Sequence, residues 1–271
     1  ATAGGDGRVK LWNSETGTEI FTLVGHRDLI FDLKFSSDGK KLASGSWDGT
    51  MHIWDLENLG EFHKIDMGSI SPYTVGFTPN DLYAVSGDLD QNIDFWEIDA
   101  ASSYRTLVGH TKVMSAFDFS PDGKNIVTAS WDGKVKVWLV HSGMLVGKME
   151  KHEGQVCAVK YDPKSRFIAS GGSDNSIILW DPEANKISQT LRGHSSPVTS
   201  IEITSDGLRL ISCSVDGTVK VWDLITNKEI YSRIQISRTE WLATTPCGAF
   251  DGSSKALDLV NYVSGMEVVP V

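Results

Sequence analysis

A histidine, a hydroxyl side chain and an aspartate recur together along this chain. In the first complete set His26 is followed by Ser44 and by Asp48, four residues after the serine. A hydroxyl nucleophile, an imidazole base and an orienting carboxylate are the groups of a serine hydrolase. A hydrolase needs one such site, whereas these residues recur in four repeats, each time with a tryptophan. A Trp N–H, a hydroxyl, an imidazole and a carboxylate also form a chain that satisfies buried donors and acceptors. We therefore interpret the sets as structural.

The tryptophans that accompany these sets follow a period of 42 residues. They are Trp12, Trp54, Trp96, Trp138, Trp180 and Trp222. An aspartate stands six residues before each of them, and a Ser or Thr stands four residues before each aspartate. The histidine is present in four repeats, whereas Gly68 takes its place in the third repeat and the first repeat has none. This period predicts an array of one repeated supersecondary unit.

Each repeat is predicted to form four short β-strands. In the sixth repeat, turn residues at Ser205-Asp206-Gly207 and Asp216-Gly217 separate runs rich in β-branched residues. Such turns between alternating runs are typical of hairpins. The predicted strands of this repeat are residues 198–204, 208–214, 219–222 and 228–233. Four antiparallel strands repeated around an axis make an all-β propeller.

The chain resembles the WD40-repeat β-propeller family over residues 1–235. The resemblance rests on the Gly25-His26, Gly109-His110 and Gly193-His194 pairs, the turn at Ser120–Gly123 and the closing Trp-Asp pairs such as Trp54-Asp55. It implies a scaffold that binds proteins, peptides or sometimes nucleic acid. It also implies structural tetrads, which would be His26/Ser44/Asp48/Trp54, His110/Thr128/Asp132/Trp138, His152/Ser170/Asp174/Trp180 and His194/Ser212/Asp216/Trp222. His52, His63 and His141 fall outside this pattern, and we expect them to be ordinary surface or strand residues.

The two ends of the chain decide how many blades we expect. Residues 1–238 contain the repeats, but the first one lacks its innermost strand. Residues 240–248 resemble such a strand, so we expect residues 239–271 to belong to the same domain and to complete the first blade. Six blades result, and a seventh, degenerate blade built from the tail is the alternative. A capping Ser253 or Ser254, an apolar face and Gly265 predict a short helix over residues 253–265.

The segment from Trp241 to Ser253 also resembles one that follows the propeller in bacterial multidomain WD40 proteins, some of which carry a caspase-like peptidase domain. Cys247 replaces the more usual acidic or polar residue of that segment. The resemblance implies a regulatory or sensing module of a larger protein. We expect a monomeric domain, with fusion to further domains in that case.

Composition excludes several other classes of function. The chain has 271 residues and a formal net charge of −10, which argues against a nucleic-acid partner because nucleic-acid binders carry basic surfaces. Its apolar stretches are far shorter than the ~20 residues of a membrane-spanning helix. Cys157, Cys213 and Cys247 form no CxxC pair, so we expect no disulfide and no metal site, and a reducing, cytoplasmic location. We also expect no cofactor.

The repeat positions locate a candidate binding surface at one rim of the propeller. The residue before each repeat aspartate lies on the turn between the second and third strands. In repeats two and four this residue is a tryptophan. Since aromatic residues dominate interface energetics, we predict a partner site there. Its residues are Leu29, Phe31, Trp47, Tyr73, Leu89 and Trp131. The alternative is that the two tryptophans pack over neighbouring turns and that Phe31 belongs to the core between blades.

These observations predict a non-catalytic scaffold that binds a protein or peptide, as a regulatory or sensor module of a signalling protein. One alternative is an enzyme that uses the central channel. The polar residues of the inner strands show no motif spacing that supports it; they are Asp32, Lys34, Asp118, Lys160 and Glu202. The other alternative is a nucleic-acid-binding propeller, which the acidic net charge disfavours.

Overall fold

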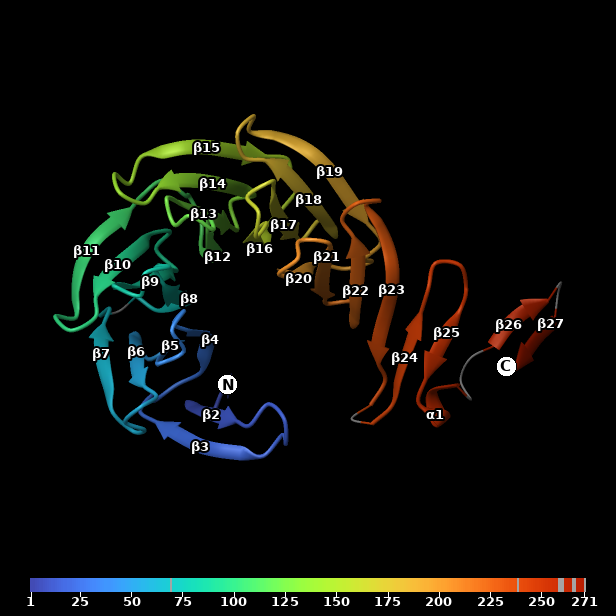
Figure 1. Ribbon diagram of the computed structural model, residues 1–271, viewed down its shortest axis with the longest axis horizontal. Helices are drawn as coiled ribbons and strands as arrows, with labels where there is room; N and C mark the ends of the chain where they lie inside the picture. Colours follow the sequence, from blue (N-terminus) through green and yellow to red (C-terminus); the bar gives the residue numbers. More distant parts are fainter. Residues whose placement is uncertain (69, 238, 258–260, 265–266, 271) are drawn as a thin grey trace.

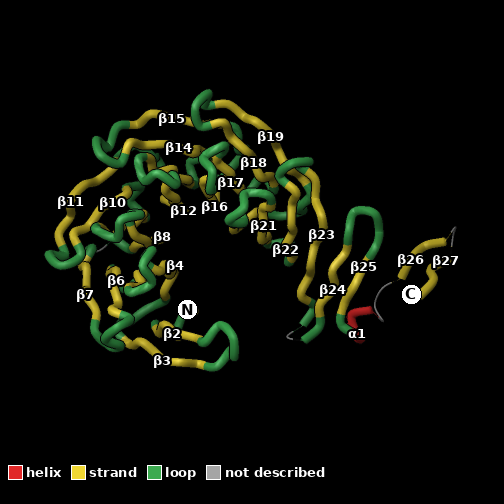
Figure 2. Tube along the Cα trace, in the orientation of Figure 1, coloured by secondary structure: helices red, strands yellow, loops and turns green. Residues whose placement is uncertain are grey.

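Six β-sheets lie side by side around a central axis in chain order (Figure 1). The computed structural model describes residues 1–68, 70–237, 239–257, 261–264 and 267–270. Nearly all regular structure in these ranges is strand, and one short helix lies near the C-terminus (Figure 2). The predicted six-bladed propeller is therefore confirmed. We call the sheets blades one to six; blades one and six lie at the two ends of an open arc (Figure 1).

Blades two to five each contain four antiparallel strands, with the first strand of each blade innermost. Blade two consists of β4 (Ile30–Phe35), β5 (Lys41–Ser46), β6 (Thr50–Asp55) and β7 (Phe62–Asp66). Blade three consists of β8 (Pro72–Phe77), β9 (Tyr83–Asp88), β10 (Ile93–Glu97) and β11 (Ser102–Leu107). Blade four consists of β12 (Met114–Phe119), β13 (Asn125–Ser130), β14 (Lys134–Leu139) and β15 (Leu145–Glu150). Blade five consists of β16 (Val156–Tyr161), β17 (Ile168–Gly172), β18 (Ser176–Asp181) and β19 (Lys186–Arg192).

The two terminal blades differ from this plan. Blade one has three strands, β1 (Thr2–Ala3), β2 (Arg8–Trp12) and β3 (Glu19–Val24). Blade six begins with β20 (Val198–Ile203), β21 (Arg209–Ser214), β22 (Thr218–Asp223) and β23 (Lys228–Gln235). Its sheet continues outward with β24 (Trp241–Thr244) and β25 (Phe250–Gly252). The helix α1 (Ser254–Leu257) and the hairpin of β26 (Asn261–Ser264) and β27 (Glu267–Pro270) follow.

The same turn joins the second and third strands of blades two to six and the first two strands, β1 and β2, of blade one. The residue after the repeat aspartate has a positive φ in all six, and these residues are Gly7, Gly49, Gln91, Gly133, Asn175 and Gly217. Glycine adopts this left-handed conformation without steric strain, which explains the recurring Asp-Gly pairs of the sequence. The turn holds each aspartate at one rim of the propeller.

Apolar side chains pack between neighbouring blades and form the core. At the first junction Leu42 and Trp54 of blade two contact Val9, Leu11 and Leu23 of blade one. Similar buried clusters fill the other four junctions between consecutive blades. Because each blade buries one face against the preceding blade, the 42-residue period of the sequence reappears as a period of the core.

The tail strand does not complete blade one, so this part of the prediction is wrong. β24 pairs antiparallel with β23, with Gln235 opposite Trp241 and Ser232 opposite Thr244. A short turn joins the two strands, in which the Ile236 amide donates to the Glu240 carbonyl at 2.8 Å. Closing a loop of this length costs less conformational entropy than crossing to the far end of the arc. The tail therefore extends blade six and does not form a separate seventh blade.

The predicted C-terminal helix is present but much shorter than residues 253–265. The helix of the described residues covers Ser254–Leu257, and Asn261–Ser264 pairs instead with Glu267–Pro270 as a hairpin. Tyr262, Val263, Val268 and Val269 are aromatic or β-branched, and such residues favour strands. Val260 and Gly265, which entered the helix prediction, lie outside the described residues.

Candidate functional site

All four predicted His/hydroxyl/Asp/Trp sets are joined by hydrogen bonds. In blade two the Trp54 indole donates to Ser44 Oγ at 2.8 Å, Ser44 Oγ lies 2.7 Å from His26 Nε2, and His26 Nδ1 lies 3.0 Å from Asp48. The same chain of bonds occurs in blades four, five and six. These three sets are His110, Thr128, Asp132 and Trp138; His152, Ser170, Asp174 and Trp180; and His194, Ser212, Asp216 and Trp222.

The direction of these bonds follows from the chemistry of each group. An ionised carboxylate only accepts, so the imidazole donates its Nδ1 hydrogen to the aspartate and accepts at Nε2. Burial lowers the pKa of His26, His110 and His152, which keeps these imidazoles neutral. The hydroxyl then donates to Nε2 and accepts from the indole.

The hydroxyl residues of the four sets are completely buried in this structure. Their exposed fraction is 0% in each case, and they are Ser44, Thr128, Ser170 and Ser212. A hydrolase needs a nucleophilic hydroxyl that its substrate can reach, and a partner protein can contact only exposed side chains. In this structure Thr128, Ser170 and Ser212, like Ser44, are out of reach of a substrate or partner and form hydrogen bonds within their blades.

Blades one and three retain only part of this network. Trp12 donates to Thr2 Oγ1 at 2.8 Å, and Trp96 donates to Ser86 Oγ at 2.9 Å. The four complete sets bury their tryptophans, whereas Trp12 is 39% exposed because it lies at the open end of the arc. The indole–hydroxyl bond is thus common to all six blades.

The three histidines outside the sets differ from one another. His63 and His141 are exposed, as expected for surface residues. His52 lies in β6 but is only 2% exposed, between the ring of His26 at 3.8 Å and that of Phe62 at 4.3 Å. Its Nδ1 is buried and has no hydrogen-bond partner among the described residues. His52 is therefore part of the packing around a tetrad.

A β-bulge in the innermost strand positions the candidate binding residues. In blades two to six the pairing of that strand shifts register by one residue near its start. A bulge leaves one residue unpaired and redirects its side chain. The bulged residues are Phe31, Tyr73, Ser115, Cys157 and Thr199. The mouth of the central channel thus has aromatic bulge residues in blades two and three, and small or polar ones in blades four to six.

Four of the six predicted rim residues form one continuous run of aromatic rings. Phe31 contacts Trp47 and Tyr73, with both centroid distances at 5.1 Å, and Tyr73 contacts Trp131 at 5.5 Å. Trp47 is 54% exposed, while the other three rings are partly buried. The contacts of Phe31 with Trp47 and of Tyr73 with Trp131 are edge-to-face, whereas the rings of Phe31 and Tyr73 are tilted by 35°. The run extends from blade two to blade four.

The other two predicted rim residues are leucines outside this run of rings. Leu89 is exposed on the turn between β9 and β10. Leu29 is partly buried, and its Cδ1 lies 3.7 Å from the position that a Cβ at Gly5 of blade one would take. We use "aromatic rim" below for Phe31, Trp47, Tyr73 and Trp131 only.

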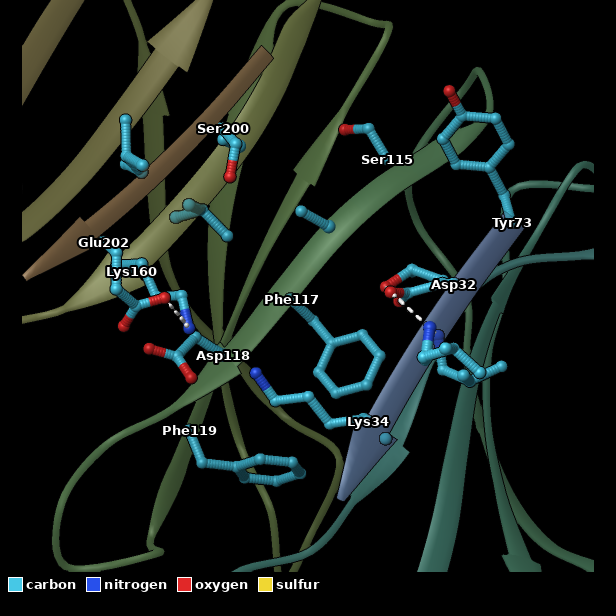
Figure 3. Close-up of a pocket in the computed structure, with 18 of the residues that line it drawn as sticks. Asp32, Lys34, Tyr73, Ser115, Phe117, Asp118, Phe119, Lys160, Ser200 and Glu202 are labelled. Carbon is cyan, nitrogen blue, oxygen red and sulfur yellow. Dashed lines mark hydrogen bonds and ion pairs between the residues drawn. The ribbon is translucent and has the colours of Figure 1, made fainter. Parts of the chain in front are cut away.

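The aromatic rim borders a cavity of about 600 Å³ in the centre of the propeller. Phe31, Tyr73 and Trp131 line it, and so do charged residues farther along the inner strands (Figure 3). Asp32 accepts hydrogen bonds from the Val75 amide and the Thr74 hydroxyl, both at 2.9 Å.

Several charged residues of the cavity follow the repeat, although their spacing matches no catalytic motif. Four of them occupy one repeat position, at spacings of 84, 42 and 42 residues in the sequence; they are Lys34, Asp118, Lys160 and Glu202. Lys160 and Glu202 form an ion pair at 3.1 Å, and the Tyr161 amide donates to Asp118 at 2.9 Å. Numbering inner-strand residues from the repeat tryptophans would have revealed this ring of charges.

Comparison with known proteins relates the repeats to one family. The family model for "WD domain, G-beta repeat" matches residues 17–55, 101–138, 143–181 and 185–223, together more than half of the chain. WD repeat and SOCS box-containing protein 1 of Takifugu rubripes is 39% identical over 69 residues, which are 25% of this chain and 16% of that protein. The Lissencephaly-1 homolog 1 of Paramecium tetraurelia is 36% identical over 61 residues, 22% of this chain and 15% of that protein.

A third relative, the Periodic tryptophan protein 2 homolog of Schizosaccharomyces pombe, is 48% identical over 46 residues, 17% of this chain and 5% of that protein. The matches to these three relatives therefore span a sixth of each relative's length or less. Within the described ranges no helix has the length and apolar character needed to cross a membrane. The repeats, their period and the blades that they form are those of the matched family, and the chain belongs to the WD40-repeat family.

Proposed function

We propose that this chain is a non-catalytic scaffold that binds a protein or peptide at the aromatic rim. Membership of the WD40-repeat family, whose propellers generally act as non-enzymatic scaffolds, supports this proposal. The observation that carries the site assignment is the continuous run of four rings at the mouth of the channel. Leu29, whose carbonyl accepts from the Trp47 amide at 2.9 Å, would extend the contact surface, as would Leu89 on the turn between β9 and β10.

The exposure of the rim supports this proposal. Trp47 is 54% exposed although it is among the largest apolar side chains, and a partner that covered it would remove this surface from water. Aromatic anchors surrounded by weaker contacts supply most of the binding energy in protein interfaces. Neighbouring ring contacts also limit the rotamers of Phe31 and Tyr73 before binding, so that less side-chain entropy is lost on association.

We further propose that the domain acts as a regulatory or sensor module of a larger signalling protein. The resemblance of residues 241–253 to the segment after other propellers supports this role. A cytoplasmic location is proposed with it, because three free thiols, Cys157, Cys213 and Cys247, suit a reducing compartment.

A displayed library of random peptides tests the binding site. We expect the parent chain to select a set of related peptides, and the Trp47→Ala/Trp131→Ala variant to lose them while it keeps its melting temperature. The matched control is Tyr104→Ala/Tyr231→Ala, which removes two exposed aromatic side chains elsewhere on the surface and retains binding. Selected peptides that bind the tryptophan variant as tightly as the parent would place the binding site elsewhere.

A further inference from the structure

The aromatic rim and the cavity below it combine two features that attract a cation. The faces of Phe31, Tyr73 and Trp131 carry negative quadrupole charge, which favours an ammonium or guanidinium group placed over them. The same three residues line the cavity, as Asp32 does from the strand position after Phe31. Figure 3 shows Asp32 and Tyr73 on the same side of this cavity.

Asp32 is a carboxylate that no cation of the described chain neutralises within ion-pair distance. Oδ2 accepts from both Thr74 and Val75, whereas among the described residues Oδ1 accepts only from the neighbouring Leu33 amide, at 2.8 Å. Burial raises the pKa of Asp32, and these hydrogen bonds, with the charge of Lys34, offset this only in part. Since a carboxylate oxygen accepts two hydrogen bonds, Oδ1 retains the capacity to accept another donor.

The residues that line the cavity together carry a negative formal charge, as Asp32 does. Its lining contains four carboxylates and two lysines, namely Asp32, Asp81, Asp118, Glu202, Lys34 and Lys160. Lys160 is already paired with Glu202 at 3.1 Å. The formal net charge of the chain is −10 as well, so the long-range field also favours a positively charged partner.

We propose that the cavity receives a lysine or arginine side chain of the partner, with Asp32 as its counter-charge and the rings of the aromatic rim around its aliphatic stem. This inference rests on the proposed function and names the chemistry of its partner. A purely apolar segment would cover Asp32 without a counter-ion, and an acidic one would meet a carboxylate, so both incur a desolvation or repulsion penalty that a basic segment avoids.

Four short capped peptides test this inference. They have the form Ala-Ala-X-Ala-Ala, with Arg, Lys, Gln or Glu at X, and binding is followed by NMR through the indole N–H signals of Trp47 and Trp131. We expect saturable shifts with the Arg and Lys peptides and none with the Gln and Glu peptides. Failure of both basic peptides to bind at about 10 mM, or equal binding of the Gln peptide, would overturn the proposal.

Two charge variants separate the role of Asp32 from a general effect of folding. Asp32→Asn should weaken binding of the Arg peptide about tenfold, as expected for the loss of one charge-assisted hydrogen bond. Lys34→Gln removes a cation that repels the basic peptide, so it should tighten binding. A variant that had merely lost structure would bind more weakly. Lys186→Gln on the exposed face of β19 is the charge-matched control and should leave the affinity unchanged.

The outcomes also distinguish this inference from the proposed function. If Asp32→Asn and Lys34→Gln leave the affinity of the basic peptides unchanged, the cation proposal fails. Peptides selected from the random library that lack basic residues, yet need Trp47 and Trp131, would support the binding site and reject its cationic partner.

Discussion

The imidazole of His52 stacks on that of His26, with ring centroids 3.8 Å apart and an angle of 14° between the planes. His26 belongs to the hydrogen-bonded tetrad of blade two, and Phe62 stacks on the other face of His52 at 4.3 Å. A protonated His52 would place a charge between two rings, next to a histidine that is itself buried. The stack therefore makes blade two sensitive to acid.

We predict that His52 lowers the stability of the fold below neutral pH. Burial, and secondarily the repulsion between the His52 and His26 imidazoles when both are protonated, lower the pKa of His52 to about 3, below the value of about 6.5 expected in an unfolded chain. Its stabilising contribution is thus complete above pH 6.5 and is lost as the pH falls from there toward 3. From pH 7 to pH 5 the parent should lose about 1–2 kcal/mol more unfolding free energy than His52→Phe.

Urea titrations at several pH values measure this difference. His63→Phe, which removes an exposed histidine from the neighbouring strand, is the matched control and should follow the parent. Parallel pH profiles for the parent and His52→Phe would show that His52 titrates normally in the folded state.

The tetrads should make unequal contributions at equivalent positions. Asp132 accepts hydrogen bonds from His110 Nδ1 at 2.9 Å and from the Thr111 and Lys134 amides, at 3.1 and 3.0 Å. Asp132→Ala leaves a buried imidazole donor unpaired and should cost about 1–3 kcal/mol of unfolding free energy. Asp90 is exposed in the blade where Gly68 replaces the histidine, so Asp90→Ala should cost less. Equal losses in denaturant titrations would contradict a stabilising role for the tetrad.

Gly133 and Gly217 occupy the same repeat position. Alanine variants at the two positions separate the cost of backbone strain from the cost of a contact between blades. Gly133 and Gly217 have φ values of 82° and 80°, so an alanine is similarly strained at either. A Cβ at Gly133 would lie 2.9 Å from the Gly154 carbonyl oxygen, whereas a Cβ at Gly217 meets nothing within 4 Å. We expect Gly217→Ala to cost about 1 kcal/mol and Gly133→Ala about 1–3 kcal/mol more. Equal melting temperatures for the two variants would exclude the contact as a cause.

Deleting residues 239–271 should leave a folded propeller. The deletion removes β24, which pairs only with the outer strand β23 and with β25, and it leaves all five junctions between blades intact. The contact of Arg233 with the Trp241 ring, 4.8 Å from its centroid, is lost. We expect the melting temperature to fall by no more than about 5 °C in differential scanning calorimetry. Aggregation of the truncated chain would mean that the tail covers part of the propeller core.

The repeat period by itself determined much of this fold. Turn residues, β-branched runs and tryptophans at a constant spacing specify local structure, and local structure follows from short-range sterics and hydrogen bonds. The strand boundaries of blade six agree with those predicted from its residues to within a few positions. The tetrad partners that the resemblance to WD40 repeats implied are joined by hydrogen bonds in all four blades, at the same spacing in each.

Exposure, in contrast, depends on how whole blades pack and is not encoded in the spacing of one repeat. The sequence places a hydroxyl, a histidine and an aspartate together, which a hydrolase site and a structural network have in common. The complete burial of Thr128, Ser170 and Ser212 separates the two, because a buried hydroxyl contacts no ligand.

Only the tertiary structure decided which side chains meet between repeats. The bulges that direct Phe31 and Tyr73 to the channel mouth depend on how β4 and β8 pair, which no local pattern of these strands reveals. The buried position of His52 depends on Phe62 of the next strand. The tail strand matched a first strand in sequence, yet it pairs with β23, because strand pairing is set by the nearest available edge rather than by the sequence of one strand.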